Sequence, residues 1–277
     1  MFNDKRNETS FGGLMVLKNI WTNRFLIGIL IRREIAVRYR GSIFGVFWSV
    51  INPIFMLSIY TFVFGVVFKA RWNVGSDSKT EFALVLFSGL VTFNIFSENI
   101  NRAPTLIVSN LNYVKKVIFP LEILPIVVLG VSIYNGIIGY VLWFIAYLFF
   151  FGLPEVTSLL LPVVLLPLIF ISLGVSWFLA SLSVYIRDIS QFIGIVTSVL
   201  IFLSPVFYPI SGVPEAYRGW LMLNPLTPTI EQVRGVLFWG EYPNLFMLLI
   251  NFFCGILVAG AGLMWFQKTR KGFADVI

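Results

Sequence analysis

Long stretches without Asp, Glu, Lys or Arg dominate the sequence and constrain its fold more than any other feature. A helix that spans a bilayer needs about 20 mostly apolar residues. Five charge-free stretches meet this length, at 41–68, 123–154, 156–186, 189–214 and 242–267. A sixth, 82–97, is shorter, and we expect its helix to continue past Glu98 and Arg102, with both charges facing protein or the membrane interface. The sequence therefore predicts six membrane spans.

The composition excludes a water-soluble domain and several kinds of enzyme. Hydrophobic residues make up 58% of the 277 residues and charged residues 12%. A soluble domain is typically about 45–50% apolar and about 25% charged. The sequence has no histidine and one cysteine, Cys254, which excludes His-dependent general-base catalysis, Cys/His zinc sites and an intrachain disulfide. We expect an all-α membrane protein.

The basic residues indicate how the spans are oriented. Cytoplasmic segments of membrane proteins are enriched in Lys and Arg. Here these residues concentrate before the first span, after the second and fourth spans, and after the last. Because an even number of spans places both termini on one side, both are expected to be cytoplasmic. Topology then explains the net charge of +7, and no nucleic-acid partner is needed.

We divide the chain into three parts. Residues 1–40 form a cytoplasmic N-terminal segment, which lacks the apolar core and cleavage site of a signal peptide and is expected to be retained. Residues 41–267 form the membrane domain, and residues 268–277 form a cytoplasmic tail. The expected spans are 42–68, 82–108, 122–151, 157–184, 189–209 and 243–267, with short re-entrant helices in the segment 210–242.

The segment 19–40 is predicted to be a basic amphipathic helix along the cytoplasmic interface. Its apolar run, 25–31, is too short to cross a bilayer. A stripe at helical spacing consists of Leu26, Ile29, Leu30, Arg33 and Val37. One interpretation is an anchor for anionic lipid. The other is that the helix also docks a soluble partner, which Glu34 favours because an acid gains nothing from anionic lipid.

Prolines divide the segment 205–242 into pieces too short to cross a bilayer, of which 216–223 and 229–239 are semi-apolar. Non-helical backbone at membrane depth is tolerated only where protein or water satisfies its polar groups, and broken helices of this kind often line a substrate path. A re-entrant segment is therefore one interpretation. The alternative is an extracytoplasmic loop that rests on the headgroups, with Tyr217, Trp220 and Trp239 in an aromatic belt.

The sequence lacks the parts that would let the chain drive transport by itself. It has no G-x-x-x-x-G-K-[ST] motif, the phosphate-binding loop of many ATPases. Acidic residues are almost absent from the predicted spans, whereas ion-coupled transporters typically carry them at mid-membrane. The paired acids of a membrane glycosyltransferase or hydrolase are also missing. Energy for any transport must therefore come from elsewhere, or the chain does no work.

Six short motifs occur in order along nearly the whole chain, between residues 15 and 270. They are RYRGSIFGVFW at 38–48, Asn52-Pro53, VKKVIFP at 114–120, YIRDI at 185–189, SPVFYP at 204–209 and NPLTP at 224–228. Together they resemble the type-2 ABC transporter permeases, and within these the branch that exports O-antigen, capsule and wall teichoic acid. The resemblance implies a six-span half-transporter that works as a homodimer with two separate ABC ATPase subunits. Those subunits would bind ATP and Mg²⁺, and this chain would bind no cofactor.

The resemblance also implies roles for particular residues. A docking surface for the ATPase would consist of Glu34, Arg38, Arg40, Arg187 and Asp188. Spans one and five would line the channel of the dimer, and its aromatic channel and gate residues would be Tyr60, Phe202, Phe207, Tyr208, Tyr217 and Trp220. Such rings stack on the apolar faces of sugars. Lipid contact or packing is the alternative for each ring, because the chain has 29 Phe.

The expected function is that of the permease subunit of an ATP-driven exporter in the bacterial inner membrane. Its cargo would be a lipid-linked polysaccharide, with O-antigen as the first candidate. Two alternatives stay open. A type-2 permease for teichoic acid, capsule, drug or lipid would share the fold and differ in cargo. A membrane-embedded glycan-processing enzyme would turn over a lipid-linked sugar without ATP.

Overall fold

The computed structural model describes residues 13–38, 40–42, 44–67, 72, 79–114 and 119–276, and every regular element among them is a helix. This confirms the all-α expectation. Short turns of 3₁₀- or π-helix extend several of the longer helices.

Four helices are long and apolar enough to cross a membrane, and each coincides with a predicted span. They are α4 (Lys79–Arg102, extended by η3, Ala103–Thr105), α6 (Ile123–Phe151), α7 (Leu161–Tyr185, preceded by η5, Val156–Leu160) and α11 (Leu245–Thr269). The first and fifth predicted spans are also apolar helices but shorter. They are α3 (Trp48–Tyr60, continued by the π-helix η2, Thr61–Val67) and α8 (Ile189–Leu203).

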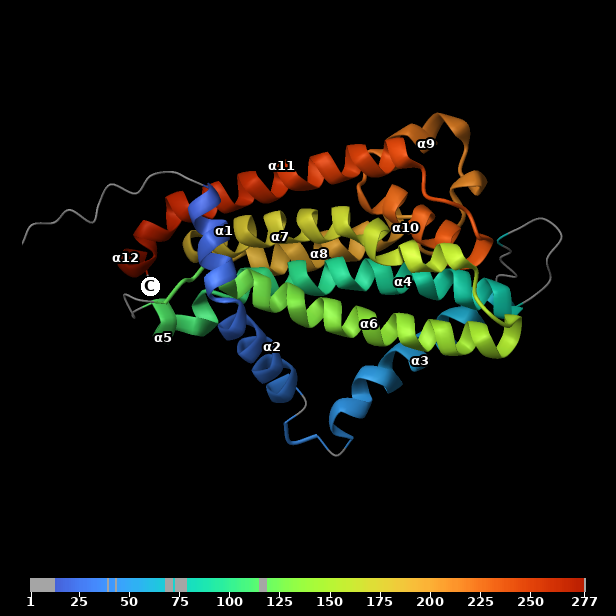
Figure 1. The fold of residues 1–277 in the computed structure, drawn as a ribbon, viewed down its shortest axis with the longest axis horizontal. Coiled ribbons are helices and arrows are strands. Elements are labelled where there is room, and N and C mark those ends of the chain that lie inside the picture. The colour runs from blue at the N-terminus through green and yellow to red at the C-terminus, as the bar shows by residue number, and fades with distance from the viewer. Residues whose placement is uncertain are drawn as a thin grey trace, which may run out of the picture.

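The long helices run side by side, with α4 at the centre (Figure 1). Of the 24 residues of α4, 15 are buried, whereas α11 buries few residues and lies at the edge against α7. The helix α3 is tilted away from α6 and buries only Ser49. One face of α3 is therefore left open.

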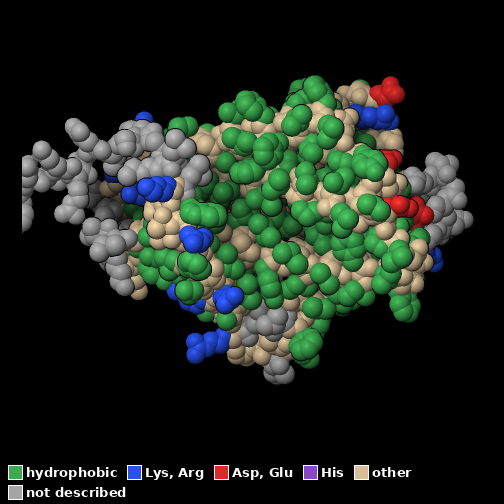
Figure 2. Space-filling view, viewed as in Figure 1, with side chains coloured by type: hydrophobic (Ala, Val, Ile, Leu, Met, Phe, Trp, Pro, Cys, Tyr) green, Lys and Arg blue, Asp and Glu red, His purple; other side chains and the backbone are tan. Residues whose placement is uncertain are grey.

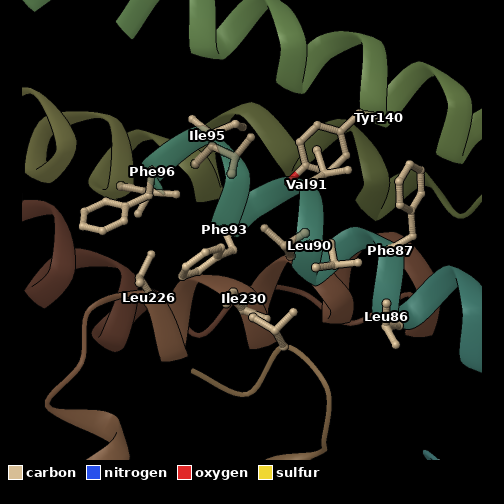
Figure 3. Packing of buried hydrophobic residues seen from close by; sticks show 14 of the residues in the cluster. Leu86, Phe87, Leu90, Val91, Phe93, Ile95, Phe96, Tyr140, Leu226 and Ile230 are labelled. Carbon is tan, nitrogen blue, oxygen red and sulfur yellow. The ribbon is translucent and has the colours of Figure 1, made fainter. Parts of the chain in front are cut away.

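The segment between α8 and α11 folds back into this bundle. It forms α9 (Glu215–Met222), α10 (Leu226–Arg234) and the π-helix η7 (Gly235–Trp239). Figure 3 shows α4 between α6 and α10, with Phe93 and Leu90 on the side of Leu226 and Ile230. Because lipid is as apolar as these side chains, close packing and hydrogen bonds hold such helices together. α10 is thus part of the core, whereas α9 has no buried residue.

Glycines let α11 approach α7 closely. A Cβ at Gly262 would meet the carbonyl of Gly174, and one at Gly255 would lie 2.9 Å from the carbonyl oxygen of Pro167. Gly260, on the same helix, has nothing within 4 Å of that position. Small residues at helix contacts are typical of membrane proteins because they allow the backbones to touch.

The amphipathic segment is two helices rather than one. α1 (Gly13–Thr22) and α2 (Arg24–Arg38) meet at Asn23. α2 buries Ile27 and Leu30 against α6, and it leaves Ile29 and Val37 of the predicted stripe exposed. The predicted stripe was therefore wrong in part, because packing against α6 selects a face rotated from the one that spacing alone indicates.

α8 ends at Leu203, six positions before the predicted end of the fifth span. Ser204 is extended, and Pro205 has no N–H to continue the helical hydrogen bonds. The residues that follow turn sharply, and Val206 and Phe207 are buried.

The residues after the last span are folded. They form η8 (Arg270–Gly272) and α12 (Phe273–Val276), and Phe273 is fully buried against Phe266. Glu122, at the start of α6, accepts hydrogen bonds from Arg270 and from Asn19, both at 2.8 Å. The segment expected to be a tail is thus joined to both α1 and α6.

Charge is distributed unevenly along the bundle. Figure 2 shows most of the visible Lys and Arg side chains at the end that carries α1 and α2, and the visible Asp and Glu at the opposite end, near α9. The surface between them is largely hydrophobic. We call these the α2 end and the α9 end.

Candidate functional site: a polar cavity between α3, α4 and α6

A cavity of about 590 Å³ lies between α3, α4 and α6. Arg38 of α2 and Ile201 of α8 complete its lining. Its volume falls in the range of about 300–1,000 Å³ that is usual for small-molecule sites. Unlike most such sites, it carries many uncharged polar side chains, and most of them come from the membrane-length helices α4 and α6.

α4 contributes most of this polarity. Asn94, Ser97, Glu98 and Asn101 follow one another at positions i, i+3, i+4 and i+7, so they share one face of the helix. Towards the α9 end the same lining is apolar, with Phe87, Leu90 and Val91. Polar residues inside spans are costly and usually mark a substrate or ion pathway.

An ion pair lies where the cavity meets α2. Arg38 and Glu98 are 2.5 Å apart, and the amide of Asn135 on α6 donates to both oxygens of Glu98, at 3.0 and 2.8 Å. The two charges compensate each other, so this end of the cavity carries no net charge.

A second cavity, of about 380 Å³, continues from the first and shares Tyr60, Ser97 and Asn101 with it. Its further lining includes Phe202 and Phe207. The rings of Tyr60 and Phe207 lie 5.1 Å apart, those of Phe207 and Phe202 lie 5.7 Å apart, and the hydroxyl of Tyr208 donates to the carbonyl of Phe202. The four aromatic residues expected in the channel are thus brought together.

The two residues expected at the gate lie elsewhere. Tyr217 and Trp220 are on α9, and both are exposed. Neither lines the two cavities just described. Their role in the gate stays a prediction.

The five expected docking residues fall into two groups. Glu34 and Arg38 face α4, where Glu34 accepts a hydrogen bond from Arg102 at 2.9 Å. Arg40, Arg187 and Asp188 are exposed, the last two in the turn between α7 and α8. The structure thus gives Glu34 and Arg38 partners within the chain, and contact with another subunit stays a prediction for all five.

The segment between α4 and α6 is joined to α2 by a further contact. Arg33 donates to the hydroxyl of Tyr113 at 2.6 Å, and this hydrogen bond raises the pKa of the Arg33 guanidinium. Tyr113 belongs to α5 (Leu111–Val114) and stacks on Phe119 at 4.2 Å. Lys115 and Lys116 of this loop lie outside the described residues.

Arg234, on α10, is the residue that sequence reasoning missed. It is fully buried, donates to the carbonyls of Val85, Pro205 and Val206, and pairs with Glu231 at 2.9 Å. Its guanidinium also lies 4.1 Å from the ring centroid of Trp72. The i, i+3 pairing with Glu231 in an otherwise apolar segment was the available signal. Arg234 thus joins α10 to α4 and to the turn after α8.

These features define a multi-span helical membrane protein with a polar path beside its central helix. The model of the ABC-2 type transporter family matches residues 26–238, most of the chain, and the chain belongs to this family.

Three relatives match most of the chain. The chain is 25% identical over 256 residues to the O-antigen export system permease protein RfbA of Klebsiella pneumoniae, covering 91% of this chain and 95% of that protein. It is 25% identical over 266 residues to the RfbA protein of Myxococcus xanthus, covering 95% and 100%. It is also 25% identical over 213 residues to the polysialic acid transport protein KpsM of Escherichia coli, covering 74% and 78%.

Proposed function

We propose that this chain is the permease subunit of an ATP-driven exporter that moves a lipid-linked polysaccharide, with O-antigen as the first candidate, from the cytoplasm across the bacterial inner membrane. The observation that carries the proposal is the continuous lining from the polar stripe of α4 to the aromatic cluster of Tyr60, Phe207 and Phe202. A sugar polymer needs such a path, because its hydroxyls require hydrogen bonds and its ring faces suit aromatic contact. The names of the relatives support the same cargo class.

In this proposal α3 and α8 are the first and fifth of six spans, and the α2 end faces the cytoplasm. The excess of Lys and Arg at that end supports this orientation. α9 and α10 then lie at the extracytoplasmic side and act as re-entrant helices. The chain's membership in the ABC-2 family and the position of α10 in the core support that role.

We further propose that the chain works as a homodimer with two ABC ATPase subunits. The open face of α3 and the exposed face of α8, which includes Ile195, Val199 and Phe202, would meet the second copy. The ATPases would dock at the α2 end, where Arg40, Arg187 and Asp188 are exposed. They would bind ATP and Mg²⁺, because this chain carries no phosphate-binding loop.

Deletion of the gene in the cell of origin tests the proposal. Lipid-linked polymer is expected to accumulate on the cytoplasmic side, and the polymer at the cell surface is expected to disappear. Purified chain alone is expected to hydrolyse no ATP and to support hydrolysis only with its partner. Unchanged surface polymer in the deletion strain, or hydrolysis by the isolated chain, would contradict the proposal.

A further inference from the structure

We infer that the cavity between α3, α4 and α6 binds one uncharged sugar unit of the cargo through side-chain amides and hydroxyls within each protomer. The inference rests on the proposed function and adds the chemical class that the site accepts. Its basis is a set of polar groups without partners. Among the residues that the structure describes, Asn52, Asn94 and Ser97 have no hydrogen-bond partner, and all three line the cavity.

Unpartnered polar groups on membrane helices call for a hydrophilic occupant. In the single chain Asn52 and Asn94 are exposed and Ser97 is half-buried, so their polar groups are open to an occupant of the cavity. Against lipid the same groups would lose their hydrogen bonds at a cost of a few kcal/mol. Here the neighbouring polar residues are already paired. Asn101 accepts from Thr197 at 3.0 Å, and Asn135 donates to Glu98. The free groups therefore point to an occupant that both donates and accepts hydrogen bonds.

The free side chains match a sugar in this respect. An amide offers two donors and a carbonyl acceptor, and a serine hydroxyl does both. Sugar hydroxyls also donate and accept. Trp48 and Tyr60, at the same lining, provide rings for the apolar faces of the sugar and carry polar edges.

The charges of the lining exclude an anionic unit. Among the described residues that line the cavity, Arg38 and Glu98 are the only charged ones, and they neutralise each other. A sugar carboxylate or phosphate would lose its hydration without gaining a counter-charge, and it would lie near Glu98. An uncharged unit meets neither penalty.

Cysteine labelling of the permease–ATPase complex in membranes tests whether the cavity is wet and what it holds. In the Cys254→Ser chain, Asn94→Cys should react with a charged maleimide, whereas Asn251→Cys, on α11 outside the cavity, should not. The cell's own polysaccharide, released from its lipid, should slow labelling of Asn94→Cys, and oligosialic acid at equal concentration should not. Equal labelling at both positions, protection by oligosialic acid, or protection by neither polymer would overturn the inference.

A second measurement separates this inference from the proposed function. In proteoliposomes with the ATPase, native lipid-linked polymer should stimulate ATP hydrolysis by the wild type. Asn94→Leu should raise the half-maximal polymer concentration about tenfold, the loss of about one strong hydrogen bond. Asn251→Leu is the matched control and should behave as wild type.

The two proposals fail in different ways in this measurement. Stimulation of Asn94→Leu at wild-type polymer concentrations would overturn the sugar site and leave the exporter standing. Lack of stimulation of the wild type by native polymer would overturn the exporter.

Discussion

Glu34 on α2 and Arg102 on α4 form an ion pair, and a second, crossed ion pair joins the same two helices. Glu34 and Arg38 are four residues apart on α2, and Glu98 and Arg102 are four residues apart on α4. Each helix contributes one acid and one base, and each acid meets the base of the other helix, at 2.9 and 2.5 Å. The arrangement fixes the register between an interfacial helix and the central span.

Reversal of one charge in this arrangement should destabilise the protein, and exchange of both should restore it. Glu34→Arg places two arginines side by side. Because the side chains of Glu34 and Arg102 are 27% and 32% exposed, the cost should be at most about 1 kcal/mol. The double variant with Arg102→Glu should recover most of the apparent melting temperature in detergent. A double variant no more stable than the single one would show that the pair contributes nothing.

ATPase docking should depend on the exposed basic residues at the α2 end. Arg40→Glu and Arg187→Glu should each lower the amount of co-purified ATPase about threefold or more, with a larger effect at low salt, because exposed charges act through long-range attraction. Arg218→Glu, on α9 at the opposite end, serves as the control and should retain the ATPase. Full co-purification with both single variants would place the docking surface elsewhere.

Loss of Arg234 should be severe. Arg234→Met leaves three buried carbonyls and Glu231 without their donor, which should cost about 3–5 kcal/mol. Arg234→Lys keeps the charge but lacks the planar fork, so it should restore only part of the loss. Apparent melting temperatures of solubilised protein measure the difference. Arg218→Met, on the exposed α9, is the control and should change little.

Close approach of α7 and α11 should make Gly262 intolerant of a side chain. Gly262→Ala directs a methyl group at the carbonyl of Gly174 and should cost about 1–3 kcal/mol. Gly260→Ala, on the same helix with open space, should be neutral or slightly stabilising. Thermal unfolding of the two variants side by side gives the answer. Equal effects at both positions would contradict the packing described for this pair of helices.

The aromatic cluster should matter for transport more than for folding. Phe202→Ala should lower the export rate two- to tenfold, matching the roughly 0.5–1.5 kcal/mol of one aromatic contact. Phe149→Ala is a matched control, because Phe149 is also exposed, at 86% against 63% for Phe202, but lies outside both cavities. Surface polymer in a complemented deletion strain reports the rate. Equal loss with both variants would point to expression rather than to the path.

The spans were predictable because a bilayer imposes a length and excludes charge. Residues 122–151 and 157–184 were expected as spans, and α6 and α7 nearly coincide with them. The ends of the helices were predicted less accurately, because local chemistry sets them. The fifth span was extended to residue 209 because apolar residues continue after Leu203, although Pro205 ends the helix.

The contacts of charged residues were not predictable, because they depend on which helices meet. Arg234 was not among the expected site residues, and the structure buries it completely. Glu34 suggested a protein partner, and the partner that the structure gives it is Arg102 of the same chain. Likewise, Asn94 carried no signal of its own until α3 and α6 were seen to enclose it.

The buried ring of Phe273 has a practical consequence for handling the protein. α12 is only four residues long, and its first residue packs a ring against Phe266 and Tyr185. An affinity tag joined there without a flexible spacer would disturb this packing. A chain shortened after Lys271 would lack Phe273 and leave an empty space between α11 and α7. Fusions for purification or imaging therefore belong after a long Gly/Ser linker.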